Sequence, residues 1–125
     1  MSEWFFKRTE NWFYLLLVLT VFLMRLFVYL VPEVDIIFFG IVIHHFWFGL
    51  ILSLMIFLLP TRLRVIKIIL LALGLGLMID QIIFLLLGGG KDREYWAFPS
   101  LFGAVIVTIA IYFYREKLLK VFKLN

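Results

Sequence analysis

The stretch from Ile43 to Gly49 reads IHHFWFG, and it decides how the rest of this 125-residue chain must be arranged. His44 and His45 are the only histidines in the sequence, and both lie inside a mostly apolar run from Ile36 to Leu59. A run of about two dozen apolar residues is long enough to cross a lipid bilayer as a helix. A polar side chain within such a run is costly unless it finds a partner. The fold must therefore bring partners to these histidines.

The composition of the whole chain points to a lipid environment. Hydrophobic residues make up 66% of the sequence and charged residues 16%. Ordinary globular domains are about 45–50% apolar and about a quarter charged. A soluble domain of this length could not bury so much apolar surface, so we predict a single membrane domain over residues 1–125. The sequence contains no cysteine, which excludes disulfides, thiolate metal sites and a cysteine nucleophile.

We predict an all-α, polytopic protein with four transmembrane helices. Pro32, Pro60 and the three glycines at 88–90 separate the apolar runs, because proline and glycine disfavour the helix interior. The predicted helices cover residues 12–31, 36–59, 63–87 and 99–114. Beyond them, lysines recur every three residues at 117, 120 and 123, which predicts an amphipathic interfacial helix over 115–125.

The basic residues predict the orientation. With four spans, both termini and the turn at 60–67 share one side of the membrane, and that side holds nine of the twelve lysines and arginines. The positive-inside rule therefore predicts a multi-pass protein of the cell membrane with both termini in the cytoplasm. The basic residues are divided among three short segments beside the membrane, as topology signals and anionic-lipid contacts would be. This distribution argues against a nucleic-acid partner.

The predicted topology brings ionisable side chains from three helices to one depth in the outer half of the membrane. The candidate ion or proton site consists of Arg25, His44, His45, Asp80 and Gln81. Glu33 and Asp35 would lie above it, at the outer mouth. Arg25 has two alternatives, because it could extend to the outer headgroups or pair with Asp80.

Small residues predict which helix faces pack together, because they let backbones approach closely in lipid. His45, Gly49 and Ser53 are spaced by four residues and so share one face of their helix. Ala72, Gly76 and Asp80 have the same spacing on the next helix, Gly74 broadens that face, and we predict that these two faces meet. The helix at 12–31 is bulky along most of its length, which favours a peripheral position.

Three functions fit these residues, and the sequence leaves all three open. The leading hypothesis is a polar intramembrane site that binds or relays a proton or a small cation. The alternative is a non-catalytic accessory subunit whose polar cluster only locks helix packing. The third is an intramembrane metalloenzyme that holds a divalent metal ion through His44, His45 and Asp80. Such a site would need a further ligand from Gln81, Glu33 or a second subunit.

The surroundings of the protein follow from its size. Four short helices can barely enclose a site, and aromatic-rich outer surfaces leave ample area for contacts. Besides the lipid bilayer, we therefore expect a second copy of the chain or a larger membrane complex as partner.

The histidine pair followed by Gly49, together with Gly74-Leu75-Gly76 and Asp80, resembles a pattern in small, uncharacterised prokaryotic membrane proteins. In those proteins the motif of the second helix reads HHxxxG and the third helix ends in Asp-Glu, where this sequence has Asp80-Gln81. The resemblance extends to Tyr95-Trp96, where the chain returns to the membrane interface. It implies a four-helix membrane protein and no particular activity.

Overall fold

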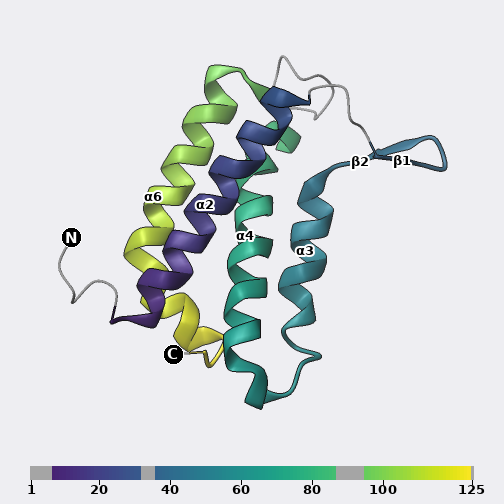
Figure 1. The fold of residues 1–125 in the computed structure, drawn as a ribbon. Coiled ribbons are helices and arrows are strands. Elements are labelled where there is room, and N and C mark those ends of the chain that lie inside the picture. The colour runs from purple at the N-terminus through teal and green to yellow at the C-terminus, as the bar shows by residue number, and fades with distance from the viewer. Residues whose placement is uncertain (1–6, 32–35, 87–94, 125) are drawn as a thin grey trace.

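The computed structural model describes residues 7–31, 36–86 and 95–124 (Figure 1). Helix α2 covers Thr9–Leu30. A small hairpin of β1 (Ile36–Phe38) and β2 (Ile41–Ile43) precedes helix α3 (His45–Met55). A 3-10 turn, η1 (Thr61–Leu63), leads into helix α4 (Arg64–Leu86), and helix α6 covers Phe98–Val121.

Three of the helices are long and apolar enough to cross a membrane. They are the segments Thr9–Leu30, Thr61–Leu86 and Phe98–Val121, with 22, 26 and 24 residues. At about 1.5 Å per residue, each is as long as the roughly 30 Å hydrocarbon layer is thick. These lengths and this apolar composition fit the predicted membrane protein.

The prediction of a fourth spanning helix over 36–59 is wrong. The helix begins at His45 and has 11 residues, about half of the length that a span needs. The residues before it pair as antiparallel strands, with Ile36 opposite Ile43 and Phe38 opposite Ile41. Phe39 and Gly40 at the tip both have positive φ angles, 51° and 78°, as a two-residue hairpin turn requires. Figure 1 shows the hairpin pointing away from the bundle.

β-branched residues explain this hairpin. Isoleucine and valine occupy most of its strand positions, and they favour strands over helices. Gly40 supplies a turn residue that takes a positive φ without strain. The count of apolar residues alone could not tell a strand pair from a helix.

The other predicted boundaries shift by smaller amounts. Helix α2 begins three residues before position 12, and α4 begins at Arg64 after its 3-10 turn. Helix α6 continues through residue 115 to Val121 without a break, so most of the predicted interfacial tail is the last part of this helix. Whether its lysines rest on the membrane surface stays a prediction.

Helix α4 is the centre of the bundle. It packs against α2, α3 and α6, whereas α3 packs chiefly against α4. Helix α2 packs against both α4 and α6, so the predicted peripheral position of residues 12–31 is wrong and α3 takes that place instead. Phe13 and Leu17 of α2 and Leu71 of α4 are fully buried in the shared core.

Glycines set the distance between the helices. A Cβ atom on Gly49 would lie 2.5 Å from the carbonyl oxygen of Gly74, and one on Gly74 would lie 2.3 Å from Oγ of Ser53. The predicted face of His45, Gly49 and Ser53 therefore does pack on α4. Its glycine partner is Gly74, because Gly76 faces α2, where an added Cβ would lie 2.7 Å from Cβ of Thr20.

Side-chain contacts bring the start of α2, the start of α4 and the end of α6 to one end of the bundle. Nε of Arg115 donates a hydrogen bond to Oδ1 of Asn11 at 2.8 Å. Nε of Arg64 donates to the carbonyl oxygen of Leu124 at 2.9 Å. This arrangement fits the predicted common side for the two termini, while the side of the membrane on which they lie stays a prediction.

Candidate functional site

The carboxylate of Asp80 is the centre of a polar cluster at the other end of the bundle. Asp80 lies on α4 and is only 1% exposed. Its Oδ1 lies 2.6 Å from Nε of Arg25 on α2, in an ion pair without the angle of a regular hydrogen bond. Its Oδ2 lies 2.6 Å from Nε2 of His45 on α3 and accepts a hydrogen bond of 2.6 Å from the hydroxyl of Tyr95. We call Arg25, His45, Asp80 and Tyr95 the Asp80 cluster.

Arg25 points into the bundle rather than toward the headgroups. Its terminal nitrogens donate to the carbonyl oxygens of Tyr95 at 2.7 Å and of Asp80 at 2.8 Å, and more weakly to Oγ of Ser100 at 3.3 Å. The guanidinium also lies 3.8 Å from the centre of the Tyr95 ring, as a cation–π contact requires. Of the two alternatives for Arg25, the structure shows the ion pair.

The contacts of Asp80 define the hydrogen-bonding role of His45. An ionised carboxylate only accepts hydrogen bonds. Facing an ionised Asp80, Nε2 of His45 carries the proton that lies between the two side chains. Nδ1 is then left to gain or lose a proton. A carboxylate that fixes the tautomer of a neighbouring histidine in this way makes the imidazole a base with one defined reactive atom.

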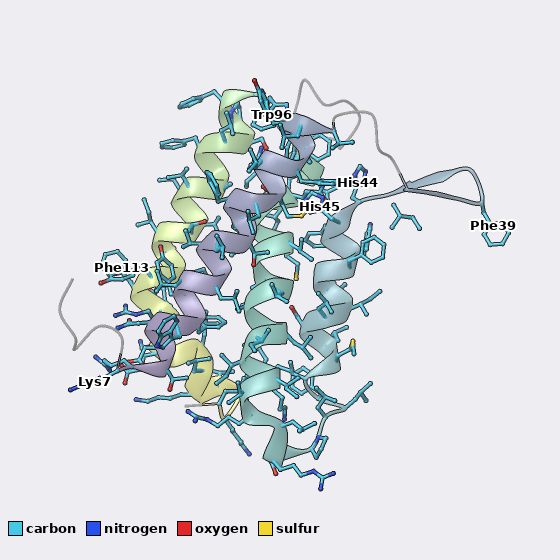
Figure 2. All side chains as sticks on the ribbon, viewed as in Figure 1. Lys7, Phe39, His44, His45, Trp96 and Phe113 are labelled. Atoms are coloured by element: carbon cyan, nitrogen blue, oxygen red, sulfur yellow. The ribbon has the colours of Figure 1, made fainter. Side chains whose placement is uncertain are left out.

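The second histidine lies apart from this cluster. His44 precedes the first residue of α3, and its ring contacts the ring of Phe84 edge to face, with 5.6 Å between the centroids. Figure 2 shows the two histidines at the start of α3, with His45 on the side toward α4. Adjacent residues cannot point to one partner, and the structure assigns Asp80 to His45 alone.

Gln81 has a helix-capping contact. Its Oε1 accepts a hydrogen bond of 2.8 Å from the backbone N–H of Phe46, in the first turn of α3. The first N–H groups of a helix have no partner within it, so this side chain satisfies one of them. Gln81 therefore fixes the start of α3, and with it the position of His45.

The predicted metal site is not supported. Across residues 7–31, 36–86 and 95–124, no group of three or more His, Cys, Asp or Glu residues could hold a metal ion. The ring of His44 meets Phe84, and the positive charge beside the carboxylate of Asp80 is already that of Arg25. The predicted outer-mouth residues, Glu33 and Asp35, lie outside the described residues.

Two residues that contact the charged side chains of the Asp80 cluster were not predicted from the sequence. They are Tyr95, which contacts Asp80, and Ser100, which contacts Arg25. Tyr95 was expected to be an interfacial aromatic residue, but it is 2% exposed and provides a hydroxyl, a carbonyl and a ring to the cluster. Its ring also meets Phe84 edge to face at 5.5 Å. The sequence feature that could have identified Tyr95 is its position three residues before the start of α6, where the chain comes back to the level of Asp80.

No protein family, curated protein or solved structure matches this sequence. The case for a function therefore depends on the geometry of the Asp80 cluster.

Proposed function

We propose that this protein binds and relays protons within the membrane, with His45 as the proton acceptor and Asp80 as its fixed counter-charge. The observation that carries the proposal is the 2.6 Å contact between Nε2 of His45 and Oδ2 of a carboxylate that is almost wholly buried. Histidine is the side chain best suited to exchange protons near neutral pH. Ionisable residues inside a membrane are costly, and they commonly mark proton or ion pathways.

Arg25 is the reason to prefer a proton over a metal ion or another small cation. Both carboxylate oxygens of Asp80 already have partners, Arg25 on Oδ1 and His45 and Tyr95 on Oδ2, so little of its coordination capacity is left for a metal ion. A proton needs no vacant coordination sphere, because it can bind to Nδ1 of His45. The ionised carboxylate beside the ring would then stabilise the imidazolium.

Tyr95 helps to hold the counter-charge in place. Oδ2 of Asp80 contacts both Nε2 of His45 and the hydroxyl of Tyr95, so two short contacts fix this carboxylate oxygen beside the imidazole. Protons would then be taken up and released at Nδ1 of His45, whose side chain is 15% exposed.

Flux measurements in liposomes test the proposal. The protein is reconstituted with a pH-sensitive dye inside, and proton entry is followed after a pH step. His45→Gln is the informative variant, because its amide can still donate a hydrogen bond to Asp80 but cannot take up a proton. His44→Gln is the matched control, since it changes the adjacent histidine, which does not contact Asp80. We expect His45→Gln to abolish proton entry and His44→Gln to retain it.

The histidine control also gives a direct spectroscopic test. His44→Gln leaves one imidazole in the chain, so its ¹⁵N NMR signals in bilayers report His45 alone. The proposal requires the neutral ring to carry its proton on Nε2 and to gain a second proton as the pH falls. A ring whose proton stays on Nδ1, or proton entry that survives in His45→Gln, would contradict the proposal.

The accessory-subunit hypothesis has an observation of its own. Arg25 on α2 contacts Asp80 on α4 and Ser100 on α6, and Asp80 contacts His45 on α3, so the cluster joins all four helices. If the cluster only stabilises helix packing, His45→Gln should change the stability of the protein in detergent. Liposomes with the unaltered protein and liposomes with His45→Gln should then both be as impermeable to protons as protein-free liposomes. Its partner would be a second copy of this chain or a larger membrane complex.

We place the protein in the cell membrane with both termini in the cytoplasm, following the distribution of lysine and arginine. Labelling of single cysteines introduced at the two ends in intact cells tests this orientation. Reaction with a membrane-impermeant reagent without lysis would contradict it.

A further inference from the structure

A groove opens between the first halves of α2 and α4, at the end of the bundle far from Asp80. Its volume is 460 Å³, within the range of pockets that hold small ligands. Buried Phe13 and Ile68 are among its lining residues, and Leu16 and Leu19 extend it along α2. Almost all of the lining is apolar. The exceptions include the guanidinium of Arg64 at the start of α4.

The groove has the dimensions of a lipid chain within one leaflet. From Thr9 to Leu19 its wall follows α2 over ten residues, which at about 1.5 Å per residue is about 15 Å. Half of the roughly 30 Å hydrocarbon layer is also about 15 Å. Because α2 and α4 are both long enough to span the membrane, the groove lies along the direction in which acyl chains run.

The polar end of the groove has a positive charge suited to phosphate. The Nε of Arg64 donates to the carbonyl oxygen of Leu124, which orients the guanidinium. Within residues 7–31, 36–86 and 95–124, its terminal nitrogens make no hydrogen bond or ion pair. Arg8, at the start of α2, is instead engaged by the carboxylates of Glu10 and Glu116. Arg64 is therefore the cation that the groove presents. Trp12, half exposed beside it, has the amphipathic ring that favours the headgroup layer.

We infer that this groove binds one anionic phospholipid, with the phosphate on Arg64 and an acyl chain along Leu16 and Leu19. Arginine is suited to this role because its planar fork can make two parallel hydrogen bonds to a phosphate. The site is independent of the proton-relay proposal, since it lies at the opposite end of α4 and shares no residue with the Asp80 cluster.

Lipid binding to the purified protein in detergent tests this inference. Native mass spectrometry would compare phosphatidylglycerol with phosphatidylcholine of the same chains. We expect phosphatidylglycerol to bind about fivefold more tightly, the effect of about one basic residue at an anionic lipid surface. Arg64→Gln should remove this preference, whereas Arg62→Gln should keep it, because Arg62 is exposed two residues away and does not line the groove.

Two further measurements separate the parts of the site. Leu19→Trp, which places bulk in the groove at a half-exposed position, should weaken binding of both lipids, while excess inorganic phosphate should compete only weakly because it lacks the acyl chain. Equal losses in Arg62→Gln and Arg64→Gln would show unspecific attraction to basic residues and overturn the inference. Full binding in Leu19→Trp, or displacement of the lipid by inorganic phosphate, would also overturn it.

Discussion

Helix α4 is held to its neighbours in two different ways along its length. Near its end, the buried carboxylate of Asp80 joins Arg25 and His45 through charge and hydrogen bonds. One to two turns earlier, Gly74 and Gly76 bring the backbone of α4 against α3 and α2 with no room for a Cβ atom. The first contact layer is polar and specific, and the second depends on shape alone.

The difference shows what each layer can contribute. Apolar burial drives no helix association in lipid, because the acyl chains are as apolar as the side chains. Close backbone packing therefore has to supply stability, and the glycine layer does this without any titratable group. The Asp80 cluster places charge where charge is costly. Such a cost is understandable if the cluster also has chemistry to perform, and the following experiments compare the two layers directly.

The largest effect is expected for Asp80→Leu. This change leaves the guanidinium of Arg25, 12% exposed, without its counter-ion, and removing one partner of a buried ion pair costs about 3–5 kcal/mol. The free energy of unfolding would be measured by SDS titration in micelles, followed by circular dichroism. The double variant Arg25→Leu/Asp80→Leu is the control, because it removes both charges and should recover much of the loss. Equal stability of the single and double variants would show that the charge pair has no role in packing.

In the glycine layer, Gly74→Ala should cost about 2–3 kcal/mol, the upper part of the range for overpacking. The added Cβ would meet the carbonyl oxygen of Gly49 at 2.6 Å, and backbone cannot move aside without moving α3. Gly103→Ala is the matched control on α6, where the Cβ would meet the side chain of Ile83 at 2.4 Å. A side chain can shift to another rotamer, so this variant should lose clearly less. The same SDS titration would rank the two, and the reverse order would contradict our account of the layer.

Tyr95→Phe tests the polar layer more finely. It removes the hydroxyl that donates to Oδ2 of Asp80 but keeps the ring under Arg25. We expect a loss of about 1.5 kcal/mol, near the upper limit for hydrogen bonds between transmembrane helices. Proton entry into liposomes should also slow, since Tyr95 helps to hold the carboxylate that faces His45. A variant that is less stable but conducts protons normally would place Tyr95 in packing alone.

Sequence reasoning reached the polar residues because their rarity makes them visible. Arg25, His45 and Asp80 are ionisable residues deep within apolar runs, and the lengths of those runs place them at a similar depth. The structure brings these three together. Depth alone could not show the rotation of each helix, so the sequence grouped both histidines with Asp80 and assigned Gly76 as well as Gly74 to the face that meets α3, whereas Gly76 faces α2.

The segment at 36–43 and Tyr95 were mispredicted for a different physical reason. In lipid-facing sequence nearly every residue is apolar, so the alternation that normally distinguishes a strand from a helix is lost. The hairpin turn at Phe39-Gly40 lacks the usual Asn-Gly pattern, which left the long apolar run as the dominant signal. Tyr95 is a common interfacial residue type, and only its contacts with Arg25 and Asp80 show otherwise.

The two histidines provide the smallest and most discriminating comparison. His44→Ala removes an edge-to-face contact with Phe84, and contacts between aromatic rings contribute about 0.5–1.5 kcal/mol. The His44 side chain makes no capping hydrogen bond to the first turn of α3, so no such bond is lost. His45→Ala removes the donor to Oδ2 of Asp80 and leaves this oxygen with the hydroxyl of Tyr95. We therefore expect His44→Ala to cost the lower part of that range in SDS titration, and His45→Ala to cost more. A larger loss for His45→Ala would report the contacts that His45 makes with the carboxylate of Asp80 and the ring of Tyr95. Equal losses would mean that the 2.6 Å contact contributes nothing to the bundle, and the polar layer would then have to be explained by Arg25 and Tyr95 alone.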